Sequence, residues 1–242
     1  MIKGLDVSRY QGVINWQQVS PPNIADGYRF AIIRATVGNY YTDPTFESNW
    51  DGARAAGIAV GAYHVLRPDN SVDSQVYRLR QVLDGNDPKF IAIDCEVTAG
   101  ADIERAVYWM GRRTREAFPN AEVAFYSAKW WWDVQVKNQD WVLQDGYGYW
   151  FAAYGSNNGQ QPWATPPTSV IPAQWINLWK MWQYTSRGQV PGIVGNVDLD
   201  LMDEEYFSKV WGAITPPPEP EPDMVTITIK KSTADDLKQV LL

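Results

Sequence analysis

Short apolar runs alternate with longer amphipathic stretches along most of this chain. Eight runs have the length and composition of β-strands, and they lie at residues 4–8, 29–35, 58–65, 91–96, 121–126, 150–154, 178–184 and 194–199. Helical patterns separate several of them, most clearly at 44–56, 71–83 and 102–118. Strands that alternate with helices favour a parallel sheet. We therefore predict an α/β fold, an irregular (β/α) TIM-like barrel with eight strands and about five helices.

The chain divides at a proline-rich acidic stretch. Its 242 residues, 45% of them hydrophobic, suit one globular domain, which we place at residues 1–214. Residues 215–223 (TPPPEPEPD) are typical of an extended linker. Residues 224–242 form a short C-terminal tail with a strand pattern followed by a helix pattern. A segment of about 20 residues cannot bury a core alone. It is either a wall-targeting remnant or flexible tail, or a segment for self-association.

Composition excludes several classes of protein. A single cysteine, Cys95, excludes an internal disulfide, and one cysteine with one histidine, His64, argues against a zinc cluster. The net charge of −7 argues against a nucleic-acid partner. No apolar run approaches the roughly 20 residues of a membrane span, so we expect no membrane partner. We see no signal peptide. We expect a protein made in the cytoplasm of an infected host that acts at the bacterial cell wall, or one secreted by another route.

Two acids, Asp94 and Glu96, follow directly on the apolar run Ile91–Ile93. Residues i and i+2 of a strand point to the same side, so both carboxyl groups would share one face. Like charges held close together and partly desolvated separate in pKa, and such a pair can supply an acid and a base. The alternative is a pair of solvated loop acids. By the same alternation, Cys95 points away as a buried, unreactive thiol.

Other acids and several aromatic residues also lie at or near predicted strand ends. The acids are Asp6, Asp94, Glu96 and Asp198, and the neighbouring side chains are Tyr63, Tyr126, Trp150, Tyr154 and Gln183. The carboxyl ends of barrel strands form one rim, so these groups would converge. Carboxyl groups surrounded by aromatic side chains favour glycoside cleavage, in which one acid must protonate the leaving oxygen. Metal binding is the rival, but no loop with closely spaced ligands supports it. We predict no metal and no cofactor.

Several spaced motifs make the chain recognisable. Residues 6–12 (DVSRYQG) followed by Asn15 and Trp16 resemble the N-terminal signature of glycoside hydrolase family 25, the muramidases common among phage endolysins. Further motifs follow in the family's order: 30–38 (FAIIRATVG), 61–64 (GAYH), 94–96 (DCE), 182–186 (WQYTS) and 191–198 (PGIVGNVD). The resemblance covers about residues 2–212. Each motif alone is weak, and their order makes the match specific.

The resemblance implies hydrolysis of the β-1,4 bond between N-acetylmuramic acid and N-acetylglucosamine in bacterial peptidoglycan. By position, Glu96 is the general acid/base, Asp94 is its partner, and Asp6 and Asp198 complete the acidic group. The family is associated with retained stereochemistry. Either the substrate's acetamido oxygen attacks, oriented by Asp94, or a carboxylate attacks directly. Tyr63, Tyr126, Trp150, Tyr154 and Gln183 occupy positions where the family contacts sugar.

Some alternatives stay open at this point. Arg34 can pair with the acids, which is the safer expectation, or bind substrate carboxylates. His64 can donate a supporting hydrogen bond or simply pack. A glycan-binding module with decayed activity and a chitin-type hydrolase are the two rival functions. Intact Asp6, Asp94, Glu96 and Asp198 argue against the decayed module.

Overall fold

We describe the protein from a computed structural model that covers residues 1–20, 27–138 and 140–213. The predicted linker at 215–223 and the segment at 224–242 lie outside the described residues. Self-association through residues 224–242 therefore stays a prediction.

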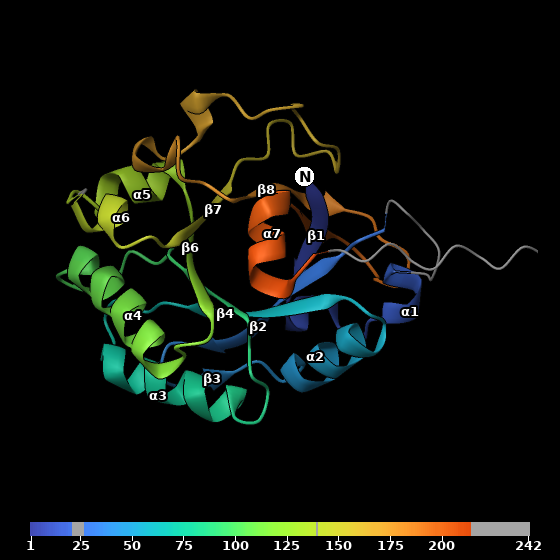
Figure 1. Ribbon diagram of the computed structural model, residues 1–242, viewed down its shortest axis with the longest axis horizontal. Helices are drawn as coiled ribbons and strands as arrows, with labels where there is room; N and C mark the ends of the chain where they lie inside the picture. Colours follow the sequence, from blue (N-terminus) through green and yellow to red (C-terminus); the bar gives the residue numbers. More distant parts are fainter. Residues whose placement is uncertain (21–26, 139, 214–242) are drawn as a thin grey trace, which may run out of the picture.

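A closed barrel of eight strands forms the centre of the molecule (Figure 1). Its strands are β1 (Ile2–Val7), β2 (Phe30–Val37), β4 (Ala59–Val65), β5 (Phe90–Asp94), β6 (Glu122–Ala128), β7 (Gly148–Ala152), β8 (Met181–Gly188) and β9 (Val197–Met202). The barrel closes because β1 pairs with both β2 and β9. A two-residue strand, β3 (Tyr41–Thr42), adds to the edge of β2. The predicted eight-stranded barrel is confirmed.

Among the eight strands of the barrel, one runs in the direction opposite to the others. Seven strands are parallel to their neighbours from β1 through β8, whereas β9 is antiparallel to both β8 and β1. The expectation of a parallel sheet is therefore wrong for β9. The connection at 189–196 is too short for the crossover that a parallel return requires, about a dozen residues or more. Instead it makes tight turns through Gly192 and Gly195, with φ of 90° and 88°.

The helices that the sequence predicts most clearly form within one or two residues of the expected ends. They are α2 (Phe46–Ala55), α3 (Val72–Leu83) and α4 (Ile103–Ala117), and they lie along the outer side of the barrel (Figure 1). Polar side chains fix where two of them begin, because Ser71 accepts a hydrogen bond from the Ser74 amide and Asp102 accepts one from the Arg105 amide. These caps explain why sequence alone locates the helix starts.

Four shorter helices complete the described fold. They are α1 (Trp16–Val19), α5 (Lys129–Gln135), α6 (Asp140–Gln144) and α7 (Glu204–Trp211). Between β7 and β8 the described chain forms only two 3-10 turns, η2 (Thr168–Val170) and η3 (Ala173–Trp175). This connection is therefore mostly irregular loop. Helix α7 was not predicted, although Asp203 caps it by accepting a hydrogen bond from the Tyr206 amide.

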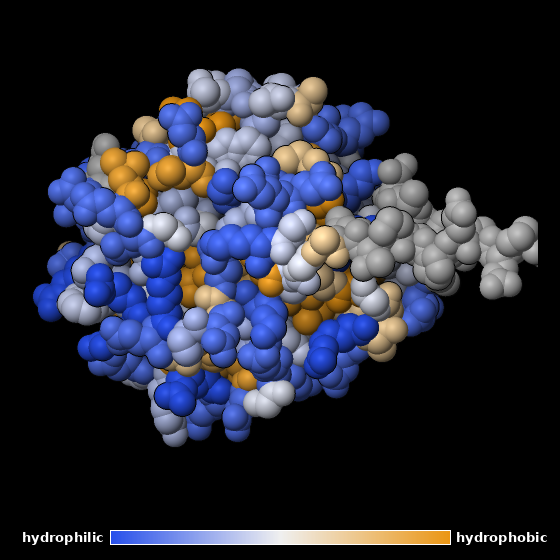
Figure 2. Space-filling model, viewed as in Figure 1, coloured by the Kyte–Doolittle hydropathy of each residue, from blue (hydrophilic) through white to orange (hydrophobic). Residues whose placement is uncertain are grey.

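Helix α7 closes the barrel at the end where the parallel strands begin (Figure 1). Trp211 packs on Phe30, the first residue of β2, with ring centroids 6.1 Å apart, and on Phe90, the first residue of β5, at 5.7 Å. Its indole nitrogen donates to the Val60 carbonyl oxygen over 3.1 Å. Figure 2 shows this face covered mainly by hydrophilic side chains, with apolar ones in small patches. Because Phe30, Phe90 and Trp211 fill this end of the barrel interior, we look for polar chemistry at the opposite end.

Candidate active site

The acids that the sequence singles out meet at the open end of the barrel. Asp6 lies near the end of β1 and Asp94 is the last residue of β5. Asp198 lies near the start of β9, directly opposite Asp6 in the strand register. Because β9 is antiparallel, its beginning, not its end, reaches this rim. Asp198 therefore joins the site for a different reason from the one predicted, which assumed a parallel eighth strand.

These groups line a cavity of about 190 Å³. Its walls are Asp6, Tyr63, Asp94, Glu96, Tyr126, Trp150, Tyr154, Gln183 and Asp198. Every site residue predicted from the sequence is among them except Arg34. The alternation of the strands places these side chains on the inner side of the barrel, and Cys95 is buried in the layer between barrel and helices, as predicted. Burial also raises the pKa of the Cys95 thiol well above its usual value, so it stays protonated.

Gln183 organises the floor of this cavity. Its side-chain oxygen accepts hydrogen bonds from the hydroxyl groups of Tyr126 (2.7 Å) and Tyr154 (2.5 Å). Its side-chain nitrogen donates to Asp6 Oδ2 over 2.6 Å. Both tyrosine hydroxyls must donate to this oxygen, which leaves the amide nitrogen free to hold Asp6. One glutamine thus fixes two rings and one carboxyl group in place.

Asp200 is a fifth acid at this end of the barrel, and our sequence reasoning missed it. It is fully buried, one inward position deeper than Asp198 on β9, and accepts a hydrogen bond from Trp150 Nε1 over 2.9 Å. Burial raises its pKa well above the usual value and the charge of Asp198 adds to this, while the hydrogen bond from Trp150 opposes it. Its Oδ2 atom is buried and has no hydrogen-bond partner among the described residues, which adds to the cost of ionising this group.

Trp150 is packed into the wall of the cavity and presents almost no surface to a ligand. Only 2% of it is exposed, its ring packs 4.5 Å from that of Tyr126, and its indole N–H is taken by Asp200. That leaves little area on which a sugar ring could stack. Tyr63 and Tyr154 are more open and line the cavity.

The pKa values of the acids are raised throughout the cavity. Burial is the largest cause for Asp6, and the charges of Asp198 and Asp200 add to it. Burial followed by the charge of Glu96 raises the pKa of Asp94 well above its usual value and that of Asp198 to about 6. The walls also remove part of the water around Glu96 and raise its pKa. Crowded carboxyl groups with little cationic compensation retain protons near neutral pH.

Glu96 and Asp94 differ in their surroundings. Glu96 follows the end of β5 and is exposed at the mouth of the cavity, within reach of a ligand. Asp94 lies deeper, and its Oδ1 atom is buried with no hydrogen-bond partner among the described residues. An unpaired buried carboxyl oxygen is costly unless a ligand supplies the partner. The arrangement can present a proton from Glu96 and an acceptor from Asp94 to the same molecule.

Arg34 lies just outside the cavity. We expected Arg34 to pair with the acids of the cavity, but its Nε atom donates to Asp43 Oδ2 over 2.7 Å. Its charge nevertheless reaches the cavity, because it acts to lower the pKa of Asp94.

His64 supports the loop beside the cavity. It is fully buried, and its Nε2 and Nδ1 atoms lie 3.1 Å from Gln75 Oε1 and 2.7 Å from Thr36 Oγ1. Gln75 Oε1 can only accept, since Gln75 Nε2 donates to the carbonyl oxygen of Arg67. His64 therefore carries its proton on Nε2 and accepts from Thr36. Burial lowers its pKa to about 4, so the ring is neutral and structural.

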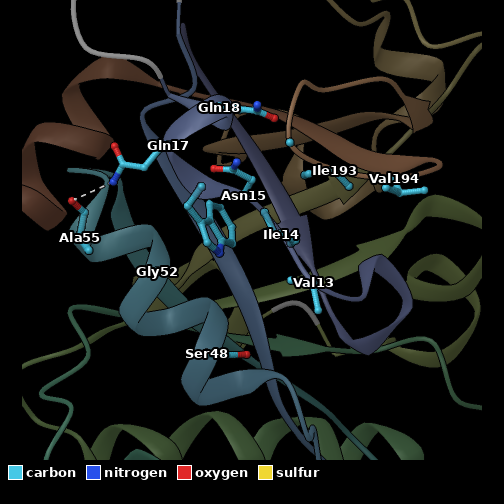
Figure 3. Close-up of a pocket in the computed structure, with 12 residues that line it drawn as sticks. Val13, Ile14, Asn15, Gln17, Gln18, Ser48, Gly52, Ala55, Ile193 and Val194 are labelled. Carbon is cyan, nitrogen blue, oxygen red and sulfur yellow. Dashed lines mark hydrogen bonds between the residues drawn. The ribbon is translucent and has the colours of Figure 1, made fainter.

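A larger hollow lies elsewhere on the molecule (Figure 3). It has a volume of about 710 Å³ and is formed by residues around α1, by α2 and by the loop before β9. Its lining is Val13, Ile14, Asn15, Trp16, Gln17, Gln18, Ser48, Gly52, Ala55, Gly192, Ile193 and Val194. None of these is an acid, a base or a strong nucleophile. The smaller acidic cavity is therefore the candidate for catalysis.

Two further searches concern metal sites and membranes. Within the described ranges, no group of three or more His, Cys, Asp or Glu side chains has the arrangement of a metal site. Among the helices that the structure describes, none combines the length and the apolar character needed to cross a membrane.

Comparison with known proteins places this geometry in a family. The model of glycosyl hydrolases family 25 matches residues 5–193. The chain is 30% identical over 209 residues to the uncharacterised protein YegX of Escherichia coli K12, covering 84% of this chain and 70% of YegX. It is 27% identical over 216 residues to lysozyme M1 of Streptomyces globisporus, covering 81% of this chain and 66% of that lysozyme.

Solved structures show the same fold. The catalytic domain of an endolysin from a Listeria monocytogenes bacteriophage superposes with a TM-score of 0.71 at 22% identity, over 88% of this chain and 98% of that domain. A family 25 glycosyl hydrolase from Bacillus anthracis gives 0.68 at 25% identity, over 86% of this chain and 93% of that protein. The motifs, the barrel and the acidic cavity agree with these matches, and the chain belongs to glycosyl hydrolase family 25, the family of lysozymes and endolysin-like muramidases.

Proposed function

We propose that this protein is a muramidase that cleaves the β-1,4 bond between N-acetylmuramic acid and N-acetylglucosamine in peptidoglycan. The observation that carries the proposal is the gathering of carboxyl groups at one barrel mouth with raised pKa values. The family match supports a peptidoglycan substrate. Cleavage of a glycosidic bond needs a group that still holds a proton near neutral pH, and this cavity supplies one.

Glu96 acts as the general acid and base. It is the most accessible of the cavity acids, and partial desolvation raises its pKa, so that it can protonate the leaving oxygen. After the bond breaks, the same carboxylate takes a proton from the attacking water, as microscopic reversibility requires. Asp6 and Asp198 lie opposite each other on β1 and β9, where they stabilise positive charge that develops on the sugar ring.

Asp94 orients the substrate's own nucleophile. Its unpartnered Oδ1 atom would accept the N–H of the acetamido group, which directs the acetamido oxygen toward the anomeric carbon. That oxygen displaces the leaving group, and water then opens the resulting ring with net retention. Direct attack by a carboxylate is the alternative route to retention, and single displacement by water would invert the anomeric centre.

The Glu96→Gln variant tests the assignment of the acid. We expect the rate of peptidoglycan cleavage to fall by about 10²–10⁴-fold, because the amide cannot donate a proton to the leaving oxygen. Clearing of a purified peptidoglycan suspension measures the rate, and thermal unfolding shows that the fold is retained. The Glu47→Gln variant on the exposed face of α2 is the matched control and should cleave normally.

Product analysis separates the proposal from its rivals. Wild-type protein should release fragments with N-acetylmuramic acid at the reducing end, and proton NMR should show the β-anomer first. Cleavage of chitin oligomers but not peptidoglycan would indicate a chitin-type hydrolase. Binding to peptidoglycan without clearing would indicate a glycan-binding module. Full activity of Glu96→Gln would remove Glu96 from its role.

A further inference from the structure

Two arginines and two tyrosines form a compact group beside the acidic cavity. We call Arg9, Tyr10, Arg34 and Tyr41 the Arg–Tyr cluster. The Arg9 guanidinium carbon lies 5.1 Å from the Tyr10 ring centroid and 5.4 Å from that of Tyr41. The Arg34 guanidinium carbon lies 5.2 Å and 5.8 Å from the same two rings. Both cations thus face the same pair of aromatic rings.

The fold builds this cluster from three neighbouring elements. Arg9 and Tyr10 belong to the 3-10 turn η1 (Arg9–Gln11). The Ser8 side chain accepts a hydrogen bond from the backbone of this turn, and the Gln11 side chain accepts one from the Ser8 amide. Arg34 lies on β2, beside Tyr63 of β4 in the strand register, and Tyr41 lies on β3. The cluster therefore stands on rigid structure at the rim of the cavity.

Positive charge in the cluster exceeds negative charge. Asp43 is the carboxylate that contacts it, and both of its oxygens are occupied: Oδ2 by Arg34 Nε and the Arg9 amide, Oδ1 by the amide and hydroxyl of Thr45. Within residues 1–20, 27–138 and 140–213, the Arg9 guanidinium takes part in no ion pair. The cluster thus holds two guanidinium groups and contacts one carboxylate, which pairs with the Arg34 guanidinium alone.

The cluster is also open to solvent. Tyr10 is 73% exposed, which is unusual for a large aromatic side chain held between two cations, and Arg9 is exposed as well. Guanidinium groups bind carboxylates through paired, charge-assisted hydrogen bonds. Arg9 is exposed and its charge is unmatched, whereas the Arg34 side chain is only 11% exposed, so Arg9 is the group that can accept a carboxylate from outside.

We propose that the Arg–Tyr cluster binds a carboxylate of the glycan substrate and so favours acidic saccharides over neutral ones. This inference rests on the proposed function, because it assumes that the adjacent cavity holds the sugar chain. The carboxylate has two sources in peptidoglycan: the lactyl group of N-acetylmuramic acid where it carries no peptide, and the peptide stem where it does. The ionised cavity acids repel a negatively charged carboxylate of the substrate. The positive charge of the Arg–Tyr cluster offsets that repulsion at the rim of the cavity.

Affinity measurements on a cleavage-deficient background test the proposal. Glu96→Gln protein is titrated with three ligands that share one tetrasaccharide of alternating N-acetylglucosamine and N-acetylmuramic acid. The first has free lactyl carboxyl groups, the second has them as primary amides, and the third has them joined to a dipeptide with a free terminal carboxylate. We expect a carboxylate ligand to bind roughly tenfold more tightly than the amide, which corresponds to about 1.4 kcal/mol.

The ligand that shows this preference identifies the source of the carboxylate. Preference for the first ligand indicates the lactyl group, and preference for the third indicates the peptide stem. The preference should weaken as salt is added, because the cluster is exposed.

Substitutions in the cluster should remove the preference. Arg9→Gln on the same background should bring the ratio of acid to amide affinity close to one, and Arg9→Lys should keep part of it. Arg34→Gln should act in the same direction, with an added effect on stability from its partner Asp43. Arg54→Gln is the matched control, because it removes the same charge from the exposed last turn of α2.

The outcomes distinguish failure of this proposal from failure of the proposed function. If wild-type protein cleaves peptidoglycan while the acid and amide ligands bind equally, or while Arg9→Gln and Arg34→Gln leave their ratio unchanged, the cluster is structural and the inference is wrong. If no ligand binds and wild-type protein does not cleave peptidoglycan, the proposed function and the inference both fall.

Discussion

The two ends of the barrel interior are built from the same strands but have opposite chemistry. At the closed end, Trp211 of α7 packs on both Phe30 and Phe90. At the open end, the inward positions of the same sheet carry Asp6, Asp94 and their neighbours. Strand geometry treats both ends alike, since alternate residues point inward along the whole length. Side-chain chemistry alone therefore decides which end stabilises the fold and which end is available for a reaction.

The two ends contribute to the free energy of folding with opposite signs. Burial of aromatic rings at the closed end favours folding. Burial of several carboxyl groups at the open end opposes it, because their charged forms lose water without gaining cationic partners. Functional sites commonly carry such a cost, and the rest of the fold compensates. Three substitutions or measurements can break or sharpen this comparison.

Phe90→Ala should have the largest effect, at the closed end. Phe90 is fully buried, and removing its ring leaves a cavity beneath Trp211. We expect a loss of about 3–5 kcal/mol in the free energy of unfolding, measured by urea denaturation. The exposed Tyr77→Ala variant on α3 is the control and should stay within about 0.5 kcal/mol of wild type. A loss no larger than that of the control would mean that the closed end contributes little.

Asp198→Asn should have a smaller effect of opposite sign, at the open end. The pKa of Asp198 is raised to about 6, so the folded protein retains this proton at pH values where the unfolded chain has lost it. The free energy of unfolding therefore falls as pH rises from about 4 to 6. Asparagine cannot ionise, so the variant should gain thermal stability relative to wild type between pH 4 and pH 7, while its cleavage rate falls.

The exposed Asp51→Asn variant on α2 controls for the change in net charge. Melting temperatures of the three proteins across this pH range provide the test. A difference between Asp198→Asn and wild type that does not change with pH would contradict the linkage.

His64 should give the smallest signal. Its pKa is lowered to about 4, so its ring should remain neutral from pH 7 to pH 5. The unfolded chain takes up this proton near pH 6.5, hence the contribution of His64 to stability is present above that pH and is lost as pH falls toward 4. This direction is opposite to that for Asp198. His64 is the single histidine of the chain, so its ring proton resonance can be followed by NMR without assignment of others. A midpoint near pH 6.5 would show that the ring is not sealed from solvent.

Much of this architecture could be predicted from the sequence because its signals are local. The apolar runs gave the barrel, and Ser71 and Asp102 marked where α3 and α4 begin. The direction of β9 could not be read this way, since it depends on the length and turns of the connection from β8. Asp200 lies on the same face of β9 as Asp198, but the predicted strand ended at residue 199, so the sequence pattern did not reach it. The Arg–Tyr cluster was hidden because its members come from separate elements and meet only in the folded chain.

The pairing of β1 with β9 joins the start of the described chain to residues near its end. During synthesis, Asp6 emerges early but has no Asp198 opposite it until β9 has been made. Long-range pairings of this kind form late and slowly. A nascent chain therefore carries Glu96 for much of its synthesis without a closed barrel around it. The last strand acts as an assembly step for the acidic cavity, and products truncated before β9 should be inert.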